Sequence, residues 1–256
     1  MSIAAAAALA DAITALDGVA VRAVILHGSL ATGTFRPTRS DLDLLVVVDD
    51  GLTDEQATAL ERLARRADLG DAAGLDLDVV TARVAAAPVR EPALELHIGR
   101  YPGPPDQPTA GEVERRVAAA PDLLAELSMA RADGLSLRGA GPHEVIGPVP
   151  PAWVVDRGRH WLRTWQTLTD DTEHAAFMVL TACRIWRFAV EGRHCAKTEA
   201  AAWALQQDPS LTAIRQALSQ YEGEPSVPVP ASAIATVLGR ALTETTRHTP
   251  QPPGWS

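Results

Sequence analysis

Two acidic residues stand at the entrance to a strand that is almost entirely apolar. Residues 42–48 read Leu-Asp-Leu-Leu-Val-Val-Val, and Asp41 precedes them. Nearly continuous β-branched apolar runs are typical of central strands that are covered on both faces. Because side chains alternate along a strand, Asp41 and Asp43 point to the same side. The chain is therefore predicted to form a layered structure with two carboxylates on one face of a sheet.

Further strands and helices are predicted on either side of a proline-rich break. Before the break, strands are expected over 21–26, 75–80 and 91–100, and helices over 3–16 and after a capping box at Thr53 and Gln56. After it, helices are expected over 111–138, 152–168, 173–192, 198–207, 210–221 and 230–247. The break itself, 101–108, holds too many prolines for regular structure. The fold class is thus predicted as α+β, with an α/β domain over 1–105 and an α-helical bundle over 106–256.

The charge and cysteine content exclude several classes of protein. Lys and Arg number 23 against 32 Asp and Glu, a net charge of −9, which argues against a protein that binds nucleic acid or an anionic membrane. The acidic balance suits a cationic small molecule instead. Cys183 and Cys195 cannot supply a disulfide framework.

Cellular location is predicted from the absence of targeting features. The alanine-rich start has no basic segment, and Asp11 interrupts its apolar run, so no secretion signal is expected. No stretch approaches the roughly 18–20 apolar residues of a membrane span. We expect a cytoplasmic protein, with a monomer as the default state.

A glycine-serine pair precedes the two aspartates by a short interval. Eleven residues separate Ser29 from Asp41. Gly28 permits close approach of the backbone to a phosphate, and Ser29 offers a hydroxyl and a helix-start N–H. Two carboxylates held close together repel unless a cation joins them, and Mg²⁺ commonly binds one or two carboxylates together with substrate phosphates. The pattern therefore predicts metal-dependent nucleotidyl transfer. The alternative is an exposed pair of aspartates beside an ordinary turn.

The pattern Gly28-Ser29-x11-Asp41-x-Asp43 resembles the signature of the DNA polymerase β-like nucleotidyltransferase superfamily. Over nearly the whole chain the sequence looks like the aminoglycoside (3'')(9) adenylyltransferases, which attach AMP from ATP to streptomycin and spectinomycin. The helical half carries the densest match, at Leu162, Trp165-Gln166, Asp170, Leu180-Thr181, Arg184-Ile185-Trp186, Gly192-Arg193 and Lys197. The resemblance implies an N-terminal nucleotidyltransferase domain, with ATP and Mg²⁺ as the donor nucleotide and the metal.

By this resemblance Asp41 and Asp43 would hold the metals, and the third acidic residue of the family's site would be the catalytic base. The family has a glutamate there, and Asp76 takes its place in this sequence. Asp78 would project from the same face of its strand, so both remain candidates, with the flanking pattern favouring Asp76. Aspartate is one methylene shorter than glutamate, which puts the reach of the base in doubt.

Arg184 and Lys197 match family positions that meet the nucleotide from the helical domain. A guanidinium fork and an ammonium point charge suit a triphosphate. Lys197 could instead be a solvated residue at a helix start, and an internal carboxylate could pair with Arg184.

Four residues match or replace family positions that face the antibiotic. Trp165 and Asp170 match positions that help to recognise streptomycin, since an aromatic wall and a carboxylate suit a guanidinium. Asp122 matches a further acidic position. His97 is the nearest match to a tryptophan of the family. Each residue has a structural alternative. Trp165 could simply pack in the core, and Asp170 could cap a loop. Asp122 could be an acid at a helix N-terminus, and His97 a histidine at a strand end.

The resemblance predicts an enzyme that adenylylates a cationic aminoglycoside or aminocyclitol and so confers resistance. Three alternatives stay open at this point. They are a nucleotidyltransferase of the same fold that acts on another small molecule or a macromolecule, an enzyme restricted to spectinomycin, and a non-catalytic nucleotide-binding module.

Overall fold

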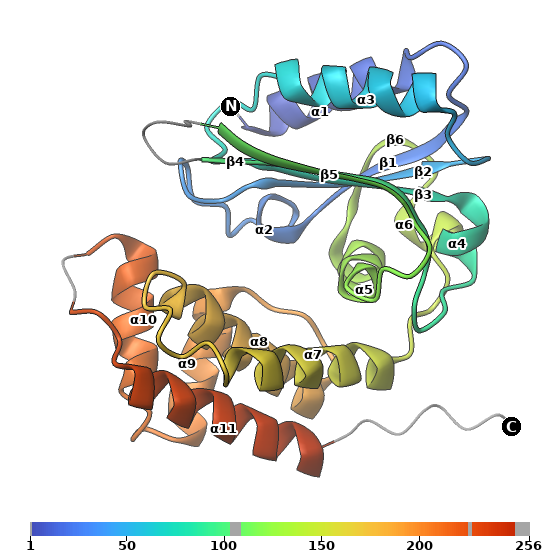
Figure 1. Ribbon diagram of the computed structural model, residues 1–256. Coiled ribbons are helices and arrows are strands. Elements are labelled where there is room, and N and C mark those ends of the chain that lie inside the picture. The colour runs from blue at the N-terminus through green and yellow to red at the C-terminus, as the bar shows by residue number, and fades with distance from the viewer. Residues whose placement is uncertain (1, 103–108, 225–226, 249–256) are drawn as a thin grey trace, which may run out of the picture. The chain divides into compact units, whose positions relative to one another are not determined.

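A six-stranded sheet with the order β5-β4-β3-β2-β1-β6 forms the centre of the N-terminal part of the chain (Figure 1). The computed structural model describes residues 2–102, 109–224 and 227–248. The strands are β1 Val21–His27, β2 Leu42–Val48, β3 Leu75–Thr81, β4 Leu94–Pro102, β5 Thr109–Val117 and β6 Leu135–Gly139. The strands β2 and β3 are parallel, and the other neighbours in the sheet are antiparallel. The predicted central position of the strand after Asp41 is confirmed.

One face of the sheet is covered by two helices, α1 (Ser2–Thr14) and α3 (Asp54–Arg66), as Figure 1 shows. Alternate residues of β2, Leu42, Leu44 and Val46, pack into the core on that side. The predicted capping box starts α3: Thr53 Oγ1 accepts from the N–H of Gln56 at 3.2 Å, and the N–H of Thr53 donates to Gln56 Oε1 at 2.7 Å.

The other face of the sheet is covered over only part of its length. Leu45 and Val47 of β2 pack there against Leu123 and Leu127 of α5 (Leu123–Asp133). Three short helices complete this side: α2 Gly28–Ala31, α4 Ala82–Ala86 and α6 Pro142–Val145. Because side chains alternate, Asp43 lies on this face. It stands near the start of β2, before Leu45 and Val47, and is only partly buried, unlike the apolar residues that follow it.

The segment 109–139 differs from the sequence prediction. A helix was expected over 111–138, whereas the structure has strand β5, helix α5 and strand β6 there. Strand β5 pairs with β4, and β6 pairs with β1, so distant partners override the local helical periodicity.

The division of the chain also differs from the one expected. The predicted boundary at 105/106 falls in 103–108, outside the described residues, but β4 and β5 on its two sides are paired neighbours in one sheet. The two units of the structure are Met1–Val149 and Pro150–Ser256. The boundary at 105/106 is therefore wrong, because residues 109–149 contribute two strands and two helices to the first unit.

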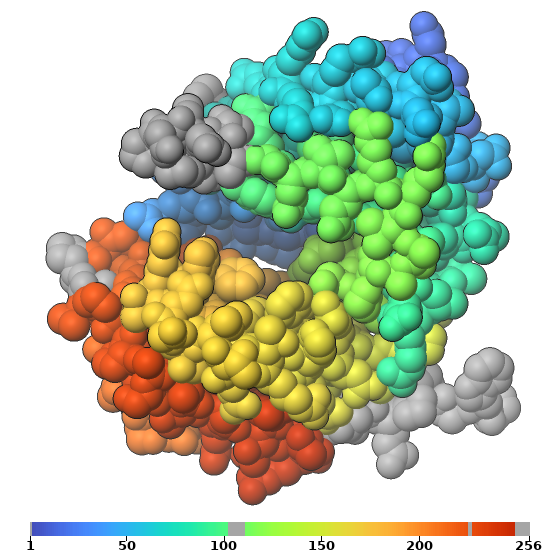
Figure 2. All heavy atoms as spheres, viewed as in Figure 1, coloured from blue at the N-terminus to red at the C-terminus, as the bar shows by residue number. Residues whose placement is uncertain are grey.

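The second unit is helical, as predicted. Its helices are α7 Pro151–Trp165, α8 Ala175–Glu191, α9 Lys197–Gln207, α10 Ala213–Glu222 and α11 Ala231–Arg247. They surround a core that includes Leu162, Cys183, Trp186 and Leu238. The side chains of α7, in yellow, lie directly against those of α11, in red (Figure 2). A sheet unit followed by a helical unit confirms the predicted α+β class. Among the described helices, none combines the length and apolar character needed to span a membrane.

Candidate active site

Asp43 and Gly28 lie in direct contact across two neighbouring strands. His27, the last residue of β1, pairs with Asp43 of β2, and Gly28 follows immediately. Gly28 has a φ of +66°, and a Cβ at this position would overlap the Asp43 carboxylate. Position 28 therefore requires glycine for two reasons: the backbone is left-handed there, and the Asp43 carboxylate occupies the space of a Cβ.

Asp41 lies in a similar way against Gly74, the residue before β3. A Cβ at position 74 would lie 2.5 Å from Asp41 Oδ1. The N–H of Leu42 donates to the carbonyl of Gly74 at 2.9 Å, which fixes this approach. Two glycines therefore let the backbone and two carboxylates pack closely at one end of β2 and β3.

Asp76 continues this row of carboxylates on the next strand. In the parallel pairing of β2 and β3 it stands directly beside Asp43. Tyr101 Oη donates a hydrogen bond of 3.3 Å to Asp76 Oδ2. Burial and the nearby charges of Asp78 and Asp41 raise the pKa of Asp76 to about 6, while His97 and the Tyr101 hydrogen bond act in the opposite direction. A carboxylate with a pKa near 6 can accept a proton at neutral pH.

Asp78 and His97 form a hydrogen-bonded pair deeper on the same face. They are directly opposite in the pairing of β3 and β4, and His97 Nδ1 donates to Asp78 Oδ1 at 2.9 Å. His97 Nε2 lies 3.3 Å from Glu112 Oε1 on β5. Burial opposes the charged ring, but the hydrogen bonds to Asp78 and Glu112 and the charges of Asp78 and Asp76 raise the pKa of His97 to about 9.

The two candidates for the base differ in exposure. The side chain of Asp76 is 40% exposed, whereas that of Asp78 is 10% exposed. A base must reach the substrate, so this difference favours Asp76 and leaves Asp78 as the partner of His97.

Ser29 and Asp122 lie in helices on the same side of the sheet. Ser29 is the second residue of α2, and its carbonyl accepts from the N–H of Thr34 at 2.9 Å. Asp122 is the exposed N-cap residue of α5, and its side chain makes no capping hydrogen bond. Asp122 therefore stands at a helix N-terminus, the position named as its structural alternative, without a capping hydrogen bond from its side chain.

In the second unit, Lys197 is the first residue of α9 and is held by aromatic rings. Its Nζ lies 5.4 Å from the ring centroids of both Phe177 and Tyr221. Phe177 and Arg184 are seven residues apart on α8, so they share one face about two helical turns apart. This arrangement places Lys197 beside the same face of α8 from which Arg184 projects.

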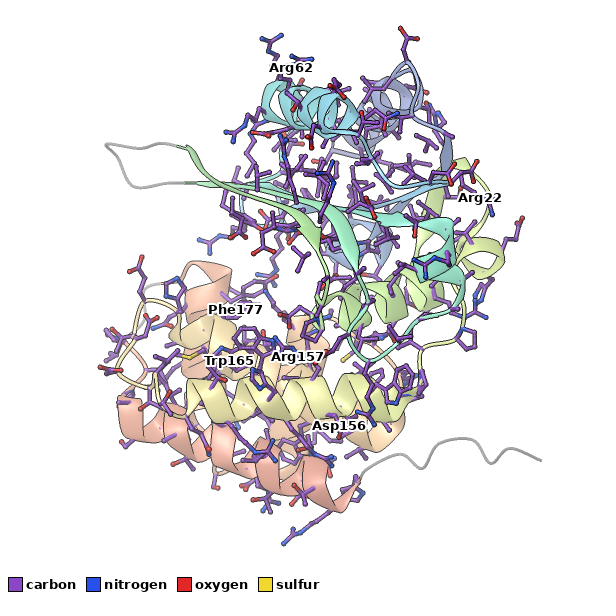
Figure 3. All side chains as sticks on the ribbon, turned by 45° about the vertical axis from the view of Figure 1, so that its right-hand side comes forward. Arg22, Arg62, Asp156, Arg157, Trp165 and Phe177 are labelled. Carbon is purple, nitrogen blue, oxygen red and sulfur yellow. The ribbon has the colours of Figure 1, made fainter. Side chains whose placement is uncertain are left out.

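Trp165 belongs to an aromatic cluster at the end of α7. It stacks on Trp161, with centroids 5.7 Å apart, and meets Phe177 edge-on at 5.6 Å. Figure 3 shows Trp165, Phe177 and Arg157 gathered in this part of the unit, and Arg157 lies 5.0 Å over the Trp161 ring. Trp165 is only 7% exposed and packs in the core, while Phe177 is half-exposed. Packing is thus part of the role of Trp165.

Asp170 and its neighbour Asp171 have different surroundings. Asp171 Oδ1 accepts from the N–H of His174 at 3.2 Å, at the start of α8, and its carboxylate also pairs with the His174 ring. Asp170 is exposed, and among the described residues its side chain has no hydrogen-bond or ion-pair partner. The backbone hydrogen bond before α8 is thus made by Asp171 and not by Asp170, and the N-cap residue of α8 is His174.

Several residues at these sites were not identified from the sequence. They are Tyr101 and Glu112 around Asp76 and His97, Gly74 beside Asp41, and Phe177 and Tyr221 around Lys197. Tyr101 lies near the end of β4, but the prolines that follow it in the sequence predict irregular structure from residue 101 onwards. Pairing of β4 and β5, which brings in Glu112, has no local signal in the sequence.

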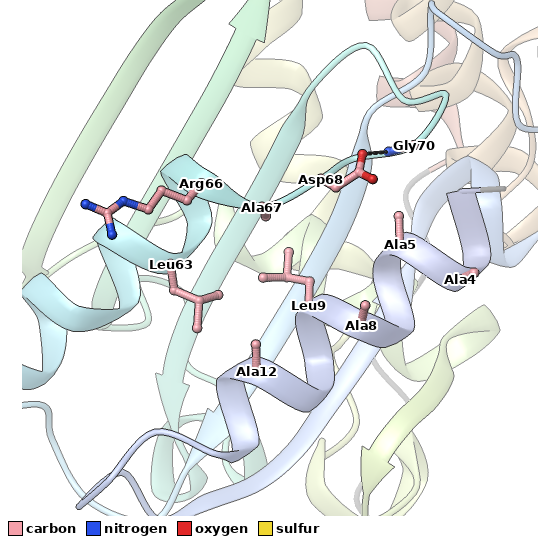
Figure 4. Close-up of a pocket in the computed structure, with 10 residues that line it drawn as sticks. All are labelled: Ala4, Ala5, Ala8, Leu9, Ala12, Leu63, Arg66, Ala67, Asp68 and Gly70. Carbon is pink, nitrogen blue, oxygen red and sulfur yellow. Dashed lines mark hydrogen bonds between the residues drawn. The ribbon is translucent and has the colours of Figure 1, made fainter.

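A groove of about 850 Å³ lies away from the carboxylates, between α1 and α3 (Figure 4). It is lined by Ala4, Ala5, Ala8, Leu9, Ala12, Leu63, Arg66, Ala67, Asp68 and Gly70. Asp68 is engaged by the N–H of Gly70 at 2.9 Å. Its lining is mostly small and apolar, and it lies on the side of the sheet away from Asp41, Asp43 and Asp76, so we do not assign the active site to it.

The two units match two protein-family models. Residues 8–96 match the nucleotidyltransferase domain, and residues 144–243 match the C-terminal domain of aminoglycoside adenylyltransferase. The second match begins near the observed division at 149/150.

Curated relatives and a solved structure extend these matches over most of the chain. The chain is 32% identical over 209 residues to an aminoglycoside (3'')(9) adenylyltransferase of Klebsiella pneumoniae, which covers 79% of this chain and 78% of the relative. A relative of the same name from Rhizobium radiobacter is 30% identical over 207 residues, with 76% and 72% covered. The crystal structure of spectinomycin adenyltransferase AAD(9) from Enterococcus faecialis with ATP and spectinomycin has a TM-score of 0.66, 18% identity, and coverage of 89% and 92%. At this identity the likeness is one of fold.

Proposed function

The chain belongs to the aminoglycoside (3'')(9) adenylyltransferase family and is a nucleotidyltransferase, and we propose that it transfers AMP from ATP to a hydroxyl of an aminoglycoside or aminocyclitol antibiotic. Such a modification would confer resistance on a host. The net charge of −9 suits a cationic acceptor and disfavours a nucleic acid. ATP as the donor favours action in the cytoplasm.

The observation that carries this proposal is the row of carboxylates at one end of the sheet. Asp43 pairs in register with Asp76 on the next strand, and Asp41 is held two residues before Asp43. Three carboxylates on one face, beside a glycine whose missing Cβ makes room for one of them, repel one another unless cations neutralise them.

The residues present fit magnesium. Asp41 and Asp43 supply carboxylate oxygens, the ligands that a small hard cation prefers, and we propose that they hold it. Bound magnesium would neutralise phosphate charge and favour departure of pyrophosphate. Gly28 and Ser29 border the same place, where the backbone can approach the triphosphate closely.

Asp76 is proposed as the general base. The acceptor hydroxyl gives its proton to Asp76 while its oxygen bonds to the α-phosphorus of ATP. The bond from that phosphorus to the bridging oxygen breaks, and pyrophosphate leaves with the electron pair. Asp76 has the exposure and the raised pKa, about 6, that this role requires.

Arg184 and Lys197 are proposed to bind the triphosphate from the second unit. The rings of Phe177 and Tyr221 restrict the Lys197 ammonium, so less conformational entropy is lost when it meets a phosphate. Arg184 would add a bidentate contact.

Contacts to the antibiotic are proposed for Trp165, Asp170, Asp122 and His97. Asp170 and Asp122 are exposed carboxylates, which suit a guanidinium or ammonium group. Trp165 would offer the edge that its core packing leaves free. His97 is 15% exposed, and both its nitrogens face carboxylates, so any contact with the antibiotic would use the ring surface.

Pyrophosphate release from ATP tests the proposed function. The purified chain is incubated with ATP and magnesium, and with streptomycin, spectinomycin or no antibiotic, while mass spectrometry follows adenylylated drug. We expect release that depends on both the metal and an antibiotic, with an Asp43→Asn variant as the inactive control. Absence of adenylylated product with every aminoglycoside and aminocyclitol tried would refute this function.

A further inference from the structure

Both oxygens of the Asp76 carboxylate face a donor from the neighbouring strand. Tyr101 Oη donates to Oδ2 at 3.3 Å, and His97 Nδ1 lies 3.6 Å from Oδ1. Asp76 stands opposite Gly99 in the β3–β4 pairing, so His97 and Tyr101 occupy the two flanking positions on the same face of β4. The strand register thus places one donor on each side of Asp76.

His97 is itself fixed at both ends of its ring. Its Nδ1 donates to Asp78 at 2.9 Å and its Nε2 to Glu112 at 3.3 Å. Asp78 is 8% exposed, so the stronger of these contacts is shielded from water. A ring held at both nitrogens has one orientation, and in that orientation the charged Nδ1 lies 3.6 Å from Asp76 Oδ1, within ion-pair distance, while its hydrogen points to Asp78.

Gly99 provides the space for this arrangement. A Cβ at position 99 would lie 2.6 Å from Tyr101 Cε2 and 2.9 Å from Glu112 Cγ. The tyrosine ring and the glutamate side chain therefore lie over the glycine. Any larger residue at this position would push away a partner of Asp76 or of His97.

The same cluster also has the composition of a metal site. Ligand atoms of Asp76, Asp78 and His97 lie within 4.8 Å of one another. A metal binds histidine through a deprotonated nitrogen. Each ring nitrogen of His97 faces a carboxylate, which stabilises the doubly protonated ring, and its pKa is raised to about 9 although burial opposes this. The cluster is therefore a chain of ion pairs and hydrogen bonds.

We propose that His97 and Tyr101 are positioning residues that hold the Asp76 carboxylate in the orientation needed for proton transfer, with Asp78 and Glu112 holding His97. This inference rests on the proposed role of Asp76 as base. An aspartate has a shorter side chain than glutamate, and a base must come within about 2.6–3.2 Å of the proton. Contacts from β4 to both oxygens of Asp76 keep the carboxylate in one orientation, so that it comes within reach of the proton each time a substrate binds.

The test combines conservative substitutions with a double-mutant cycle. His97→Leu removes both ring donors, His97→Asn keeps an N–H near the place of Nδ1, and Tyr101→Phe removes only the hydroxyl. We expect kcat to fall about tenfold to a hundredfold in His97→Leu and Tyr101→Phe, with KM for ATP within twofold of the wild type. His97→Asn should recover most of the loss. His143→Leu, at an exposed position of α6, is the control for loss of a histidine.

The cycle asks whether these residues act through Asp76. In an Asp76→Asn background, His97→Leu should change the remaining rate less than twofold, because there is no base to position. Equal losses with and without Asp76, or a change in KM alone, would overturn the inference.

Failure of the proposed function is seen separately, as a wild type that adenylylates no antibiotic. In that event, transfer of AMP to water, followed as pyrophosphate release, supplies the rate for the same cycle.

Discussion

The α-carbon of Gly28 lies against the carboxylate of Asp43, so that a Cβ at position 28 would overlap Asp43 Oδ2. This contact joins the turn after β1 to the carboxylate row on β2 and β3. Gly28 also has a left-handed backbone, with a φ of +66°. Two physical effects, strain and overlap, therefore meet at one residue, and they can be separated by experiment.

The first prediction concerns Gly28→Ala. Left-handed strain should cost about 1–2 kcal/mol of the free energy of unfolding, and displacement of Asp43 should remove most adenylylation activity. Gly33→Ala is the matched control, because Gly33 has a φ of +72° but no atom within 4 Å of its Cβ position. Denaturant unfolding and steady-state rates of both variants give the comparison. If the Gly33 variant lost activity equally, strain alone would explain the effect.

The second prediction concerns Asp41→Asn and Asp43→Asn. Each removes a carboxylate proposed to hold magnesium, so turnover should fall by several orders of magnitude, about 10³-fold or more. Melting temperature should stay unchanged or rise without metal, because like charges in the row are relieved. Thermal melting with and without magnesium and a non-hydrolysable ATP analogue provides the check. A variant that is still stabilised by magnesium would contradict the assignment.

The third prediction separates Asp76 from Asp78. Asp76→Asn should abolish most activity and leave stability unchanged or improved, because burial and neighbouring charge already disfavour its ionised form. Asp78→Asn removes the buried negative charge that stabilises the charged His97 ring and should cost about 3 kcal/mol of stability, with a smaller loss of kcat. Steady-state rates and urea unfolding of the two variants show which aspartate is the base. A larger loss of activity in Asp78→Asn than in Asp76→Asn would assign the base to Asp78.

Asp76→Glu tests the reach of the base. A rate above that of the wild type would show that the shorter acid is a handicap that β4 only partly offsets. A lower rate would show that His97 and Tyr101 are placed to orient the carboxylate of an aspartate and not that of a glutamate.

Much of this architecture could be predicted from the sequence because it is locally encoded. A continuous apolar run predicts β2, and the Thr53 and Gln56 pair predicts the start of α3. Helical periodicity predicts the five helices of the second unit. Local periodicity predicts helix where β5 and β6 stand, because each of these strands depends on a partner far away in the sequence. Glu-Val-Glu-Arg-Arg in β5 carries no apolar alternation, as is common for an edge strand.

The site was predictable where chemistry and spacing coincide. Asp41, Asp43 and Asp76 come from strand ends that any parallel pair would align, and β2 and β3 align them. The contacts of His97 and Tyr101 with Asp76 were not predictable. They depend on the antiparallel register of β4, in which Gly99 and not His97 stands opposite Asp76. A shift of one residue would have turned His97 and Tyr101 to the other face.

The fourth prediction is a pH dependence of stability. The pKa of His97 is raised to about 9 by Asp78, Asp76 and Glu112, whereas burial opposes the charge. A pKa raised by folding stabilises the protein fully below the unfolded value, near 6.5, and this stabilisation is lost as pH rises through 9. The difference in unfolding free energy between wild type and His97→Leu should be about 2–3 kcal/mol larger at pH 6 than at pH 10. Urea unfolding in the presence of EDTA measures it, and a difference independent of pH would show that packing alone is lost.

The last prediction concerns the choice of antibiotic. Asp170 is exposed and, in the described part of the chain, has no side-chain partner, so its carboxylate is free for the guanidinium groups of streptomycin. Loss of one charge-assisted hydrogen bond costs about 1.5–3 kcal/mol, so Asp170→Asn should lower kcat/KM for streptomycin tenfold or more and affect spectinomycin, which has no guanidinium, much less.

Asp171→Asn is the matched control for Asp170→Asn. It removes the same charge from the neighbouring position, while its amide oxygen can still accept from the N–H of His174, so stability should change little and the ratio of the two antibiotics should stay unchanged. Because His97 offers a smaller ring than a tryptophan, we expect spectinomycin to be the better acceptor in the wild type. His97→Trp should shift the ratio of the two drugs towards streptomycin, while the overall rate falls because the contacts of His97 with Asp76 and Asp78 are lost. Competition of the two drugs for one pool of enzyme and ATP, resolved by mass spectrometry, measures the ratio directly. Equal loss of both drugs in Asp170→Asn would place Asp170 outside the antibiotic site.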